Sequence, residues 1–119
     1  MRILIVDDSR AMRAIVRRHV VQAGFESAEI NEAENGQEAL DAIRASRPDI
    51  VLSDWNMPVM TGIELLEALR AEGSDVPLGF VTSESSSDFK ERAFDAGARF
   101  MITKPFGAED FTRCLAPFV

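Results

Sequence analysis

The sequence predicts an α/β fold in which a doubly wound, five-stranded parallel sheet is covered by five helices. Short apolar runs rich in β-branched residues alternate with longer segments of helical period along the whole chain. The runs are apolar without alternation, which is typical of parallel strands buried on both faces. The 119 residues, 46% of them hydrophobic, suit one compact domain with a real core, so we expect a single domain over 1–119.

The first two strand–helix units end at Pro48. A strand over residues 3–6 leads into a helix that begins at about Ser9 and that Gly24 ends, because glycine readily adopts the left-handed backbone after a helix. The next strand, over residues 28–31, is the most polar of the five, so we place it near a sheet edge. The helical residues expected to face the core are Met12, Ile15, Val16, Val20, Ala23, Ala39, Leu40 and Ile43.

Two further units follow the same pattern. A strand over residues 50–53 leads through an irregular turn into a helix over residues 62–71. A strand over residues 78–82 leads into a helix over about residues 86–96, which Gly97 ends. The third helix has a clear apolar face, made by Ile63, Leu66 and Leu69.

The fifth unit is the shortest. A strand over residues 100–103 leads into a last helix. Pro117 should end this helix, because proline lacks an amide proton and clashes with the preceding turn. The inward side chains of the helix are Phe111, Cys114 and Leu115.

Polar side chains stand where the strands stop. The first strand is followed by Asp7 and Asp8, the third by Asp54, and the fourth and fifth end near Thr82 and Lys104. Because ligands of open α/β sheets bind at the carboxyl ends of the strands, we expect these side chains to share one rim. Two unit charges about 4 Å apart repel by roughly 4 kcal/mol at an effective dielectric of about 20, so three clustered acids call for a cation. Hard oxygen ligands favour Mg²⁺, with Mn²⁺ as a substitute.

A carboxylate that faces a metal ion and a lysine suits phosphoryl transfer, which depends on positioning and on stabilising charge. Aspartate can itself be the nucleophile and form an aspartyl phosphate. We therefore expect Asp54 to accept a phosphoryl group, while Lys104 and Thr82 contact its oxygens.

Charge and composition argue against a nucleic-acid-binding, disulfide-bonded or membrane-inserted protein. The formal net charge is -7 and Lys and Arg are not clustered, which argues against direct nucleic-acid binding. The single cysteine excludes an intrachain disulfide, and the apolar run at the N-terminus is too short for a signal peptide or membrane insertion. We expect a cytoplasmic protein.

Five fragments, taken in order, are specific for one family. They are VDDS (6–9), SDWNMPVMTG (53–62), VTS (81–83), AGA (96–98) and TKPF (103–106). On these fragments the chain resembles the response-regulator receiver domains of two-component signalling, most closely the stand-alone chemotaxis regulators of the CheY type. The resemblance implies a flavodoxin-like sheet in the order 2-1-3-4-5.

The resemblance also implies roles for individual residues. Asp54 matches the phosphoacceptor, Asp8 a direct metal ligand and Asp7 a ligand that acts largely through water. Asn56 matches the residue whose backbone carbonyl binds the metal. Lys104 matches the phosphate-binding lysine, and its bond to Pro105 is expected to be cis.

Further positions concern access and switching. Thr82 matches the switch hydroxyl, the small Ser83 leaves room for the phosphodonor, and the side chains of Asn56 and Glu84 set how fast water removes the phosphate. Met101 is a departure, because similar proteins carry an aromatic switch residue there. A thioether can fill space by changing rotamer, whereas the neighbouring Phe100 would point to the other face of the sheet.

The remaining conspicuous residues have structural interpretations. We expect Trp55 and Met57 to pack or line the rim, His19 to lie at the core edge and Cys114 to pack inward. The three arginines of the first helix, which are Arg13, Arg17 and Arg18, are expected to form a solvated face.

The predicted function is a signalling switch and not an enzyme with independent turnover. A sensor histidine kinase would phosphorylate Asp54, and a downstream target, such as a flagellar motor switch or another phosphotransfer protein, would bind the modified chain. A phosphorelay intermediate, a phosphate sink and a receiver domain from a longer regulator remain alternatives.

Two other classes fit less well. An aspartyl-phosphate phosphatase of the haloacid dehalogenase type needs a second aspartate two residues after the nucleophile, where this chain has Asn56, and an inserted cap. A flavin phosphate would be repelled by Asp7 and Asp8.

Overall fold

The computed structural model describes residues 1–118, so Val119 lies outside it. Five parallel strands form one sheet. The strands are β1 (Arg2–Val6), β2 (Glu29–Ala33), β3 (Ile50–Ser53), β4 (Leu78–Thr82) and β5 (Met101–Thr103). The helices are α1 (Arg10–Val20), α2 (Gly36–Ala45), α3 (Gly62–Ala71), α4 (Ser87–Asp95) and α5 (Ala108–Leu115), with a π-helical turn η1 (Val21–Phe25) and a 3-10 turn η2 (Ala116–Phe118).

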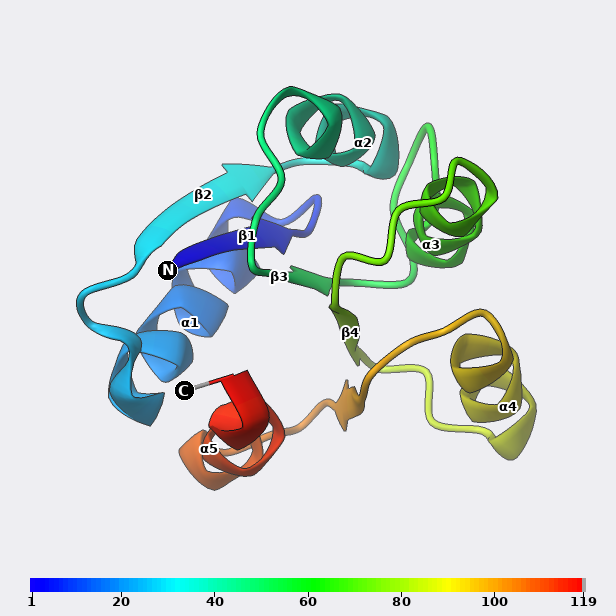
Figure 1. The fold of residues 1–119 in the computed structure, drawn as a ribbon. Helices are drawn as coiled ribbons and strands as arrows, with labels where there is room; N and C mark the ends of the chain where they lie inside the picture. Colours follow the sequence, from blue (N-terminus) through cyan, green and yellow to red (C-terminus); the bar gives the residue numbers. More distant parts are fainter. Residues whose placement is uncertain (119) are drawn as a thin grey trace.

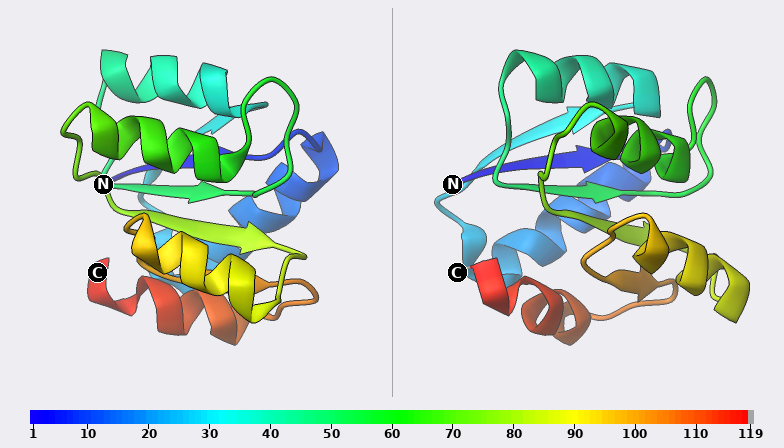
Figure 2. Two further views of the ribbon diagram at one scale, coloured as in Figure 1. Left: turned by 90° about the vertical axis from the view of Figure 1, so that its right-hand side faces the viewer. Right: turned by 45° about the vertical axis from the view of Figure 1, so that its right-hand side comes forward.

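The molecule has three layers. The strand order is β2-β1-β3-β4-β5, with α1 and α5 on one face of the sheet and α2, α3 and α4 on the other (Figure 1). In the views of Figure 2, the N-terminus and the turn η2 lie at the edge of the sheet away from the arrowheads. The predicted fold class and strand order are therefore confirmed, and the loops after the strands meet at the opposite edge.

Each face of the sheet has its own core. Ile3 and Ile5 pack with α1 and α5, whereas Leu4 and Val6 pack with α2 and α3. Gly79 on β4 is required by close packing, because a Cβ there would overlap the ring of Phe100. Burial on both faces explains why the strands are apolar without alternation.

The second strand differs from its predicted range. It runs from Glu29 to Ala33, because β1 pairs with it residue for residue, from Arg2 opposite Glu29 to Val6 opposite Ala33. As predicted, this polar strand lies at a sheet edge, where side chains need not be buried on both faces. The third and fourth strands have the predicted bounds, whereas β5 begins one residue later, at Met101.

The first helix corrects two predictions. Ser9 is its N-cap, and the hydroxyl of Ser9 accepts a hydrogen bond from the N–H of Met12. Ile15, which was expected to face the core, is 40% exposed, whereas Arg13, which was expected in solvent, is only 8% exposed. The buried face of the helix runs through positions 13, 16 and 20. The prediction, which used apolar residues alone, placed Ile15 on this face and left Arg13 in solvent.

The ends of the first and last helices agree with the sequence. The chain passes from α1 into η1, where Gly24 has φ 107°. Helix α5 ends at Leu115, and Pro117 lies in the short turn that follows. His19 is half-buried, with its ring 5.1 Å from that of Phe111 and 5.2 Å from that of Phe106, and thus lies at the core edge as expected.

Within residues 1–118, no helix has both the length and the apolar character needed to cross a membrane.

Candidate functional site

The carboxyl ends of β1 and β3 bring three acids together. Asp7, Asp8 and Asp54 form the aspartate cluster, in which carboxylate oxygens from the three residues lie within 4.8 Å of one another. Strand pairing is the cause, because the N–H of Asp54 donates to the carbonyl of Val6 at 2.9 Å. Parallel strands that pair up to their last residues necessarily place the following side chains at one rim.

Backbone donors orient two of these carboxylates. The N–H of Ser9 donates to Asp7 Oδ1 at 2.8 Å, and the N–H of Trp55 donates to Asp54 Oδ1 at 2.7 Å. Asp7 is buried and Asp54 is half-buried, whereas Asp8 is exposed. The second oxygen of Asp54, Oδ2, therefore remains for other contacts at the open side.

Lys104 supplies a positive charge to the cluster. Its Nζ lies 3.5 Å from Asp54 Oδ2 and 3.9 Å from Asp7 Oδ2. The N–H of Lys104 donates to the carbonyl of Thr82 at 2.9 Å, which ties the residue to the end of β4. The bond between Lys104 and Pro105 is cis, as expected. One ammonium group therefore lies within 3.9 Å of two of the three carboxylates.

The pKa of the Asp7 carboxyl is raised, mainly by burial. Burial raises the pKa of its carboxyl from 3.8 to about 6, and the charges of Asp54 and Asp8 act in the same direction. The N–H of Ser9 and the ammonium of Lys104 act against this rise in pKa. Burial therefore disfavours the ionised form of Asp7.

The donor set fits a hard divalent cation. All of the donors are carboxylate oxygens, which Mg²⁺ and Mn²⁺ accept, and Asp8 is open to water, which Mg²⁺ usually retains in its coordination shell. Asp7, Asp8 and Asp54 are the residues that could hold such an ion.

The other predicted site residues lie on neighbouring loops. Thr82 is fully buried at the end of β4, and its hydroxyl accepts a hydrogen bond from the N–H of Glu84 at 3.3 Å. Ser83 is exposed. Asn56 donates from Nδ2 to Glu84 Oε1 at 2.8 Å, so a side-chain bridge joins the loop after β3 to the loop after β4.

Met101 and Phe100 lie on opposite faces of the sheet, as the sequence suggested. Met101 is half-buried and packs against the core beneath α3 and α4, whereas the neighbouring Phe100 packs in the core of the opposite face. The register of β5 therefore turns the Phe100 ring away from the Met101 side of the sheet. No aromatic side chain from β5 reaches the space that Met101 fills.

Aromatic side chains surround the residue after Asp54. Trp55 is buried, with its ring centroid 4.9 Å from that of Phe80 on β4 and 4.9 Å from that of Phe89 on α4. The backbone approaches closely here as well, because a Cβ at Gly62 would overlap the carbonyl of Asp54. Packing is thus the observed role of Trp55, and it connects the loop of Asp54 to α4.

Sequence reasoning missed Arg13. Its Nη1 donates to the backbone carbonyl of Asp7 at 2.7 Å, and its Nε donates to Glu32 Oε1 at 2.7 Å. One signal was available, because Arg13 lies three residues before Val16 and therefore on the same face of the helix. The acid on β2 that balances it could not be assigned without the strand register.

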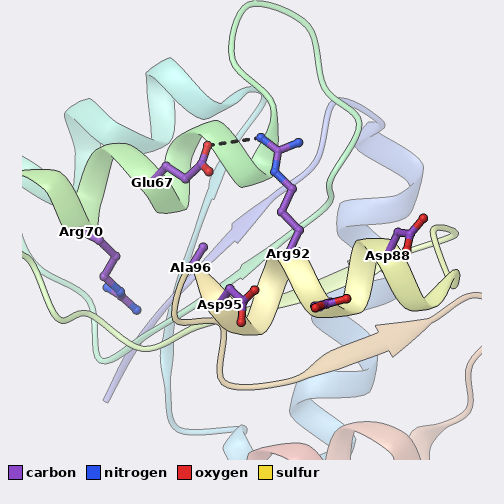
Figure 3. A pocket seen from close by; sticks show the side chains of 7 residues that line it. Glu67, Arg70, Asp88, Arg92, Asp95 and Ala96 are labelled. Atoms are coloured by element: carbon purple, nitrogen blue, oxygen red, sulfur yellow. Dashed lines mark hydrogen bonds and ion pairs between the residues drawn. The ribbon is translucent and has the colours of Figure 1, made fainter.

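A pocket lies away from the aspartate cluster. It has a volume of about 560 Å³ and lies between α3 and α4 (Figure 3). Its charged lining includes an ion pair in which Arg92 Nη2 lies 3.5 Å from Glu67 Oε1. The lining residues are Glu67, Arg70, Asp88, Glu91, Arg92, Asp95 and Ala96. None of the predicted site residues belongs to it.

Comparison with known sequences identifies relatives over almost the whole chain. The model of the response regulator receiver domain matches residues 3–116. The response regulator MprA of Mycolicibacterium vanbaalenii is 39% identical over 109 residues, which are 92% of this chain and 46% of that protein. MprA of Mycobacterium avium is 39% identical over 110 residues, 47% of its length. The chain thus spans about half the length of these relatives.

Solved structures give a second comparison. The chemotaxis protein CheY4 of Vibrio cholerae has a TM-score of 0.85 and 34% identity, with 99% of this chain and 98% of that chain covered. The signal receiver domain of the putative response regulator NarL from Mycobacterium tuberculosis has a TM-score of 0.87 over 98% of this chain and 94% of that chain. At 24% identity, this likeness shows the fold alone.

Proposed function

The chain belongs to the response regulator receiver domains, and from that premise we propose that it is a signalling switch whose phosphoacceptor is Asp54. One observation carries the proposal. The carboxylate of Asp54 lies at the end of β3, within 4.8 Å of the carboxylates of Asp7 and Asp8, with Lys104 Nζ 3.5 Å from its Oδ2. This arrangement combines a nucleophile with groups that stabilise an incoming phosphoryl group.

The proposed reaction transfers a phosphoryl group from a histidine of a sensor kinase. A carboxylate oxygen of Asp54 forms a bond to phosphorus while the bond between phosphorus and the donor nitrogen breaks. The imidazole leaves and takes up a proton from water. Lys104 pairs with one phosphoryl oxygen, and the hydroxyl of Thr82 turns from the N–H of Glu84 toward another.

The proposal includes a divalent cation, Mg²⁺ or in its place Mn²⁺. Asp7, Asp8, Asp54 and the backbone carbonyl of Asn56 would hold it. When bound, the ion would neutralise charge on the phosphoryl oxygens. The three carboxylates would supply the oxygen donors, and the Lys104 ammonium lies 3.5 Å from Asp54 Oδ2.

Three side chains at the rim are proposed to control access to the phosphate and its removal. Ser83 is small and exposed, which leaves room for a phosphodonor. Asn56 and Glu84 form a bridge at 2.8 Å between the two loops that border the site. We expect this bridge to influence how readily water reaches the aspartyl phosphate.

Switching without an aromatic residue at position 101 needs a different connection to α4. We propose that Trp55 and Phe89 provide it, because their rings are in edge-to-face contact, with centroids 4.9 Å apart and an interplanar angle of 77°. A shift of the loop after Asp54 would therefore be transmitted directly to α4. Met101 packs against the same core and adapts to such a shift by changing rotamer.

The finer function is a stand-alone regulator of the chemotaxis type, which signals by binding a target such as a flagellar motor switch. The likeness to CheY4 over 98% of that chain supports it. The MprA proteins support the alternative of a receiver domain within a regulator of about twice the length. A phosphorelay intermediate and a phosphate sink are further forms of the same chemistry. In each of them the kinase would meet the chain in the cytoplasm.

The proposal excludes independent turnover of a substrate. A phosphatase of the haloacid dehalogenase type would place an acid two residues after the nucleophile, and this chain has Asn56 there. Incubation with a generic phosphomonoester is the test of this point. We expect no sustained release of inorganic phosphate, and turnover would favour the enzyme.

Intact-mass analysis after treatment with acetyl phosphate and Mg²⁺ tests the phosphoacceptor. We expect one added phosphate on the natural protein and none on Asp54→Asn. Asp95→Asn, which changes an exposed aspartate of α4, is the control and should be labelled normally. Full labelling of Asp54→Asn would contradict the assignment.

A further inference from the structure

We propose that Arg13 is a positioning residue for the metal-binding aspartates. Its buried guanidinium holds the peptide group that joins Asp7 to Asp8, and it anchors that peptide to the edge strand β2 through Glu32. The inference rests on the proposed function, in which both aspartates bind a divalent cation. It assigns a role to a residue that contacts neither the phosphoacceptor nor Lys104.

The geometry places Arg13 on the backbone of the acidic turn. The carbonyl that accepts from Arg13 Nη1 at 2.7 Å belongs to Asp7 and is part of the peptide plane that continues into Asp8. The N–H of Asp7 donates to the carbonyl of Ala33 at 3.1 Å. Both polar backbone groups of Asp7 are therefore held, and so are the Cα atoms from which the two carboxylates project.

The position of Arg13 is electrostatically unfavourable for a positive charge, so packing alone does not explain an arginine there. It lies at the start of α1, where the unpaired N–H groups already carry partial positive charge, and no acid occupies the first turn of the helix. It is also only 8% exposed, and a buried charge destabilises the fold unless it is paired and hydrogen-bonded. Apolar residues such as Val16 and Val20 fill the same helix face.

Glu32 compensates the charge from β2. Partial burial would raise the pKa of its carboxyl, but hydrogen bonds from Arg13 and Arg17 more than offset this, and the pKa lies below its ordinary value. Glu32 Oε1 accepts from Arg13 Nε at 2.7 Å, and Oε2 accepts from Arg17 Nη2 at 2.9 Å. The guanidinium of Arg13 is thus fixed in orientation when it meets Asp7.

Arg17 is a matched control within the same network. It lies one turn after Arg13 on α1, binds the same Glu32 and donates to the carbonyl of Ile30 at 3.2 Å. It makes no hydrogen bond to Asp7. A general effect of losing an arginine or the Glu32 ion pair should therefore appear in both variants, and an effect on the aspartates only at Arg13.

The experiment compares Arg13→Met and Arg17→Met with the natural protein. Mg²⁺ is titrated while the fluorescence of Trp55, the only tryptophan and the neighbour of Asp54, is recorded without phosphodonor. Residues that orient metal ligands typically contribute 10- to 100-fold to affinity, so we expect Arg13→Met to need about tenfold more Mg²⁺ and Arg17→Met to match the natural protein.

Labelling by acetyl phosphate supplies a second measurement. If Arg13 acts by positioning, saturating Mg²⁺ restores the labelling rate of Arg13→Met, so that the Mg²⁺ dependence shifts while the maximal rate stays. If Arg13 only supports folding, the maximal labelling rate of Arg13→Met falls even at saturating Mg²⁺. The fall should then match the loss of folded protein, which urea titration measures. Unchanged Mg²⁺ dependence of Arg13→Met, or an equal shift in Arg17→Met, would overturn the inference.

Arg13→Lys serves if Arg13→Met does not fold. Lysine keeps the charge but cannot reach Asp7 and Glu32 with one planar fork, so we expect a smaller shift of the Mg²⁺ dependence in the same direction. Natural Mg²⁺ dependence in a folded Arg13→Lys would also count against the inference. Failure of the natural protein itself to respond to Mg²⁺ or to be labelled would contradict the proposed function instead.

Discussion

The two halves of the rim are built differently. The aspartate cluster, at the ends of β1 and β3, is held by short hydrogen bonds, such as those of 2.8 Å to Asp7 and 2.7 Å to Asp54. In the switch rim, which we define as Thr82–Glu84 with Lys104, two short contacts hold the backbone and the outer side chain, 2.9 Å from the N–H of Lys104 to the Thr82 carbonyl and 2.8 Å from Asn56 to Glu84. Its two groups that face the site have longer contacts, 3.3 Å from the N–H of Glu84 to the Thr82 hydroxyl and 3.5 Å from the Lys104 ammonium to Asp54.

The difference separates a preset site from a movable one. Short bonds to backbone groups fix the carboxylates before any ligand arrives, which lowers the ordering cost of binding. Loops with long or exposed contacts open at low free energy, and the elements that move in regulation are drawn from such regions. We therefore propose that one half of the rim binds the ion and that the other half carries the switching response.

Lys104→Ala is expected to have the largest effect on this comparison, because Lys104 joins the two halves of the rim. Removing one preorganised charge donor typically costs about 100-fold or more in rate, so the labelling of Asp54 by acetyl phosphate should slow by about 100-fold. The time course of intact mass measures it. Lys90→Ala, on an exposed part of α4, is the control. An unchanged rate would show that Lys104 takes no part in the transfer.

Asp7→Asn tests how much the buried, ionised carboxyl of Asp7 destabilises the fold. The raised pKa means that the folded protein binds the Asp7 proton more tightly than the unfolded chain, so this contribution to stability is present below pH 3.8 and lost as the pH rises through about 6. Above about pH 6, without metal, Asp7→Asn should therefore raise the free energy of unfolding by about 2 to 3 kcal/mol.

Urea denaturation with a chelator present, repeated at several pH values, measures this difference. The gap between Asp7→Asn and the natural protein should close toward pH 3.8, where the unfolded carboxyl also takes up its proton. Mg²⁺ should stabilise the natural protein more than the variant. A gap that does not depend on pH would assign the effect to packing and not to charge.

Phe89→Leu should have the smallest effect and concerns the switching half. Leucine keeps most of the apolar bulk but loses the edge-to-face contact with Trp55, which is worth about 1 kcal/mol. We expect normal labelling of Asp54 and a weaker change in amide exchange over residues 87–95 on phosphorylation. Phe94→Leu is the control, because Phe94 is 49% exposed. An unchanged amide-exchange response in Phe89→Leu would show that the contact between Trp55 and Phe89 does not connect Asp54 to α4.

Much of the fold followed from local pattern. The runs at residues 50–53 and 78–82 became strands with the predicted bounds, because they are mainly apolar and bounded by turn residues. The acids and the lysine were assigned to one rim because parallel strands share the direction of their ends. Their catalytic roles stay predictions.

Other features depended on contacts between segments far apart in the chain. The bounds of β2 were set by residue-for-residue pairing with β1 and not by its own polar sequence. The burial of Arg13 depended on Glu32, an acid 19 residues away on a neighbouring strand. Likewise, Phe89 could be identified as a neighbour of Trp55 only once α4 was packed on the sheet.

Periodicity and turn residues act over a few neighbouring positions, and they were enough to predict the succession of strands and helices along the chain and the acids at the strand ends. The buried arginine, the end of the edge strand and the ring that touches Trp55 could be identified only in the folded chain. The desolvation of a charge, the register of a strand and the contact of two rings depend on groups that folding brings together.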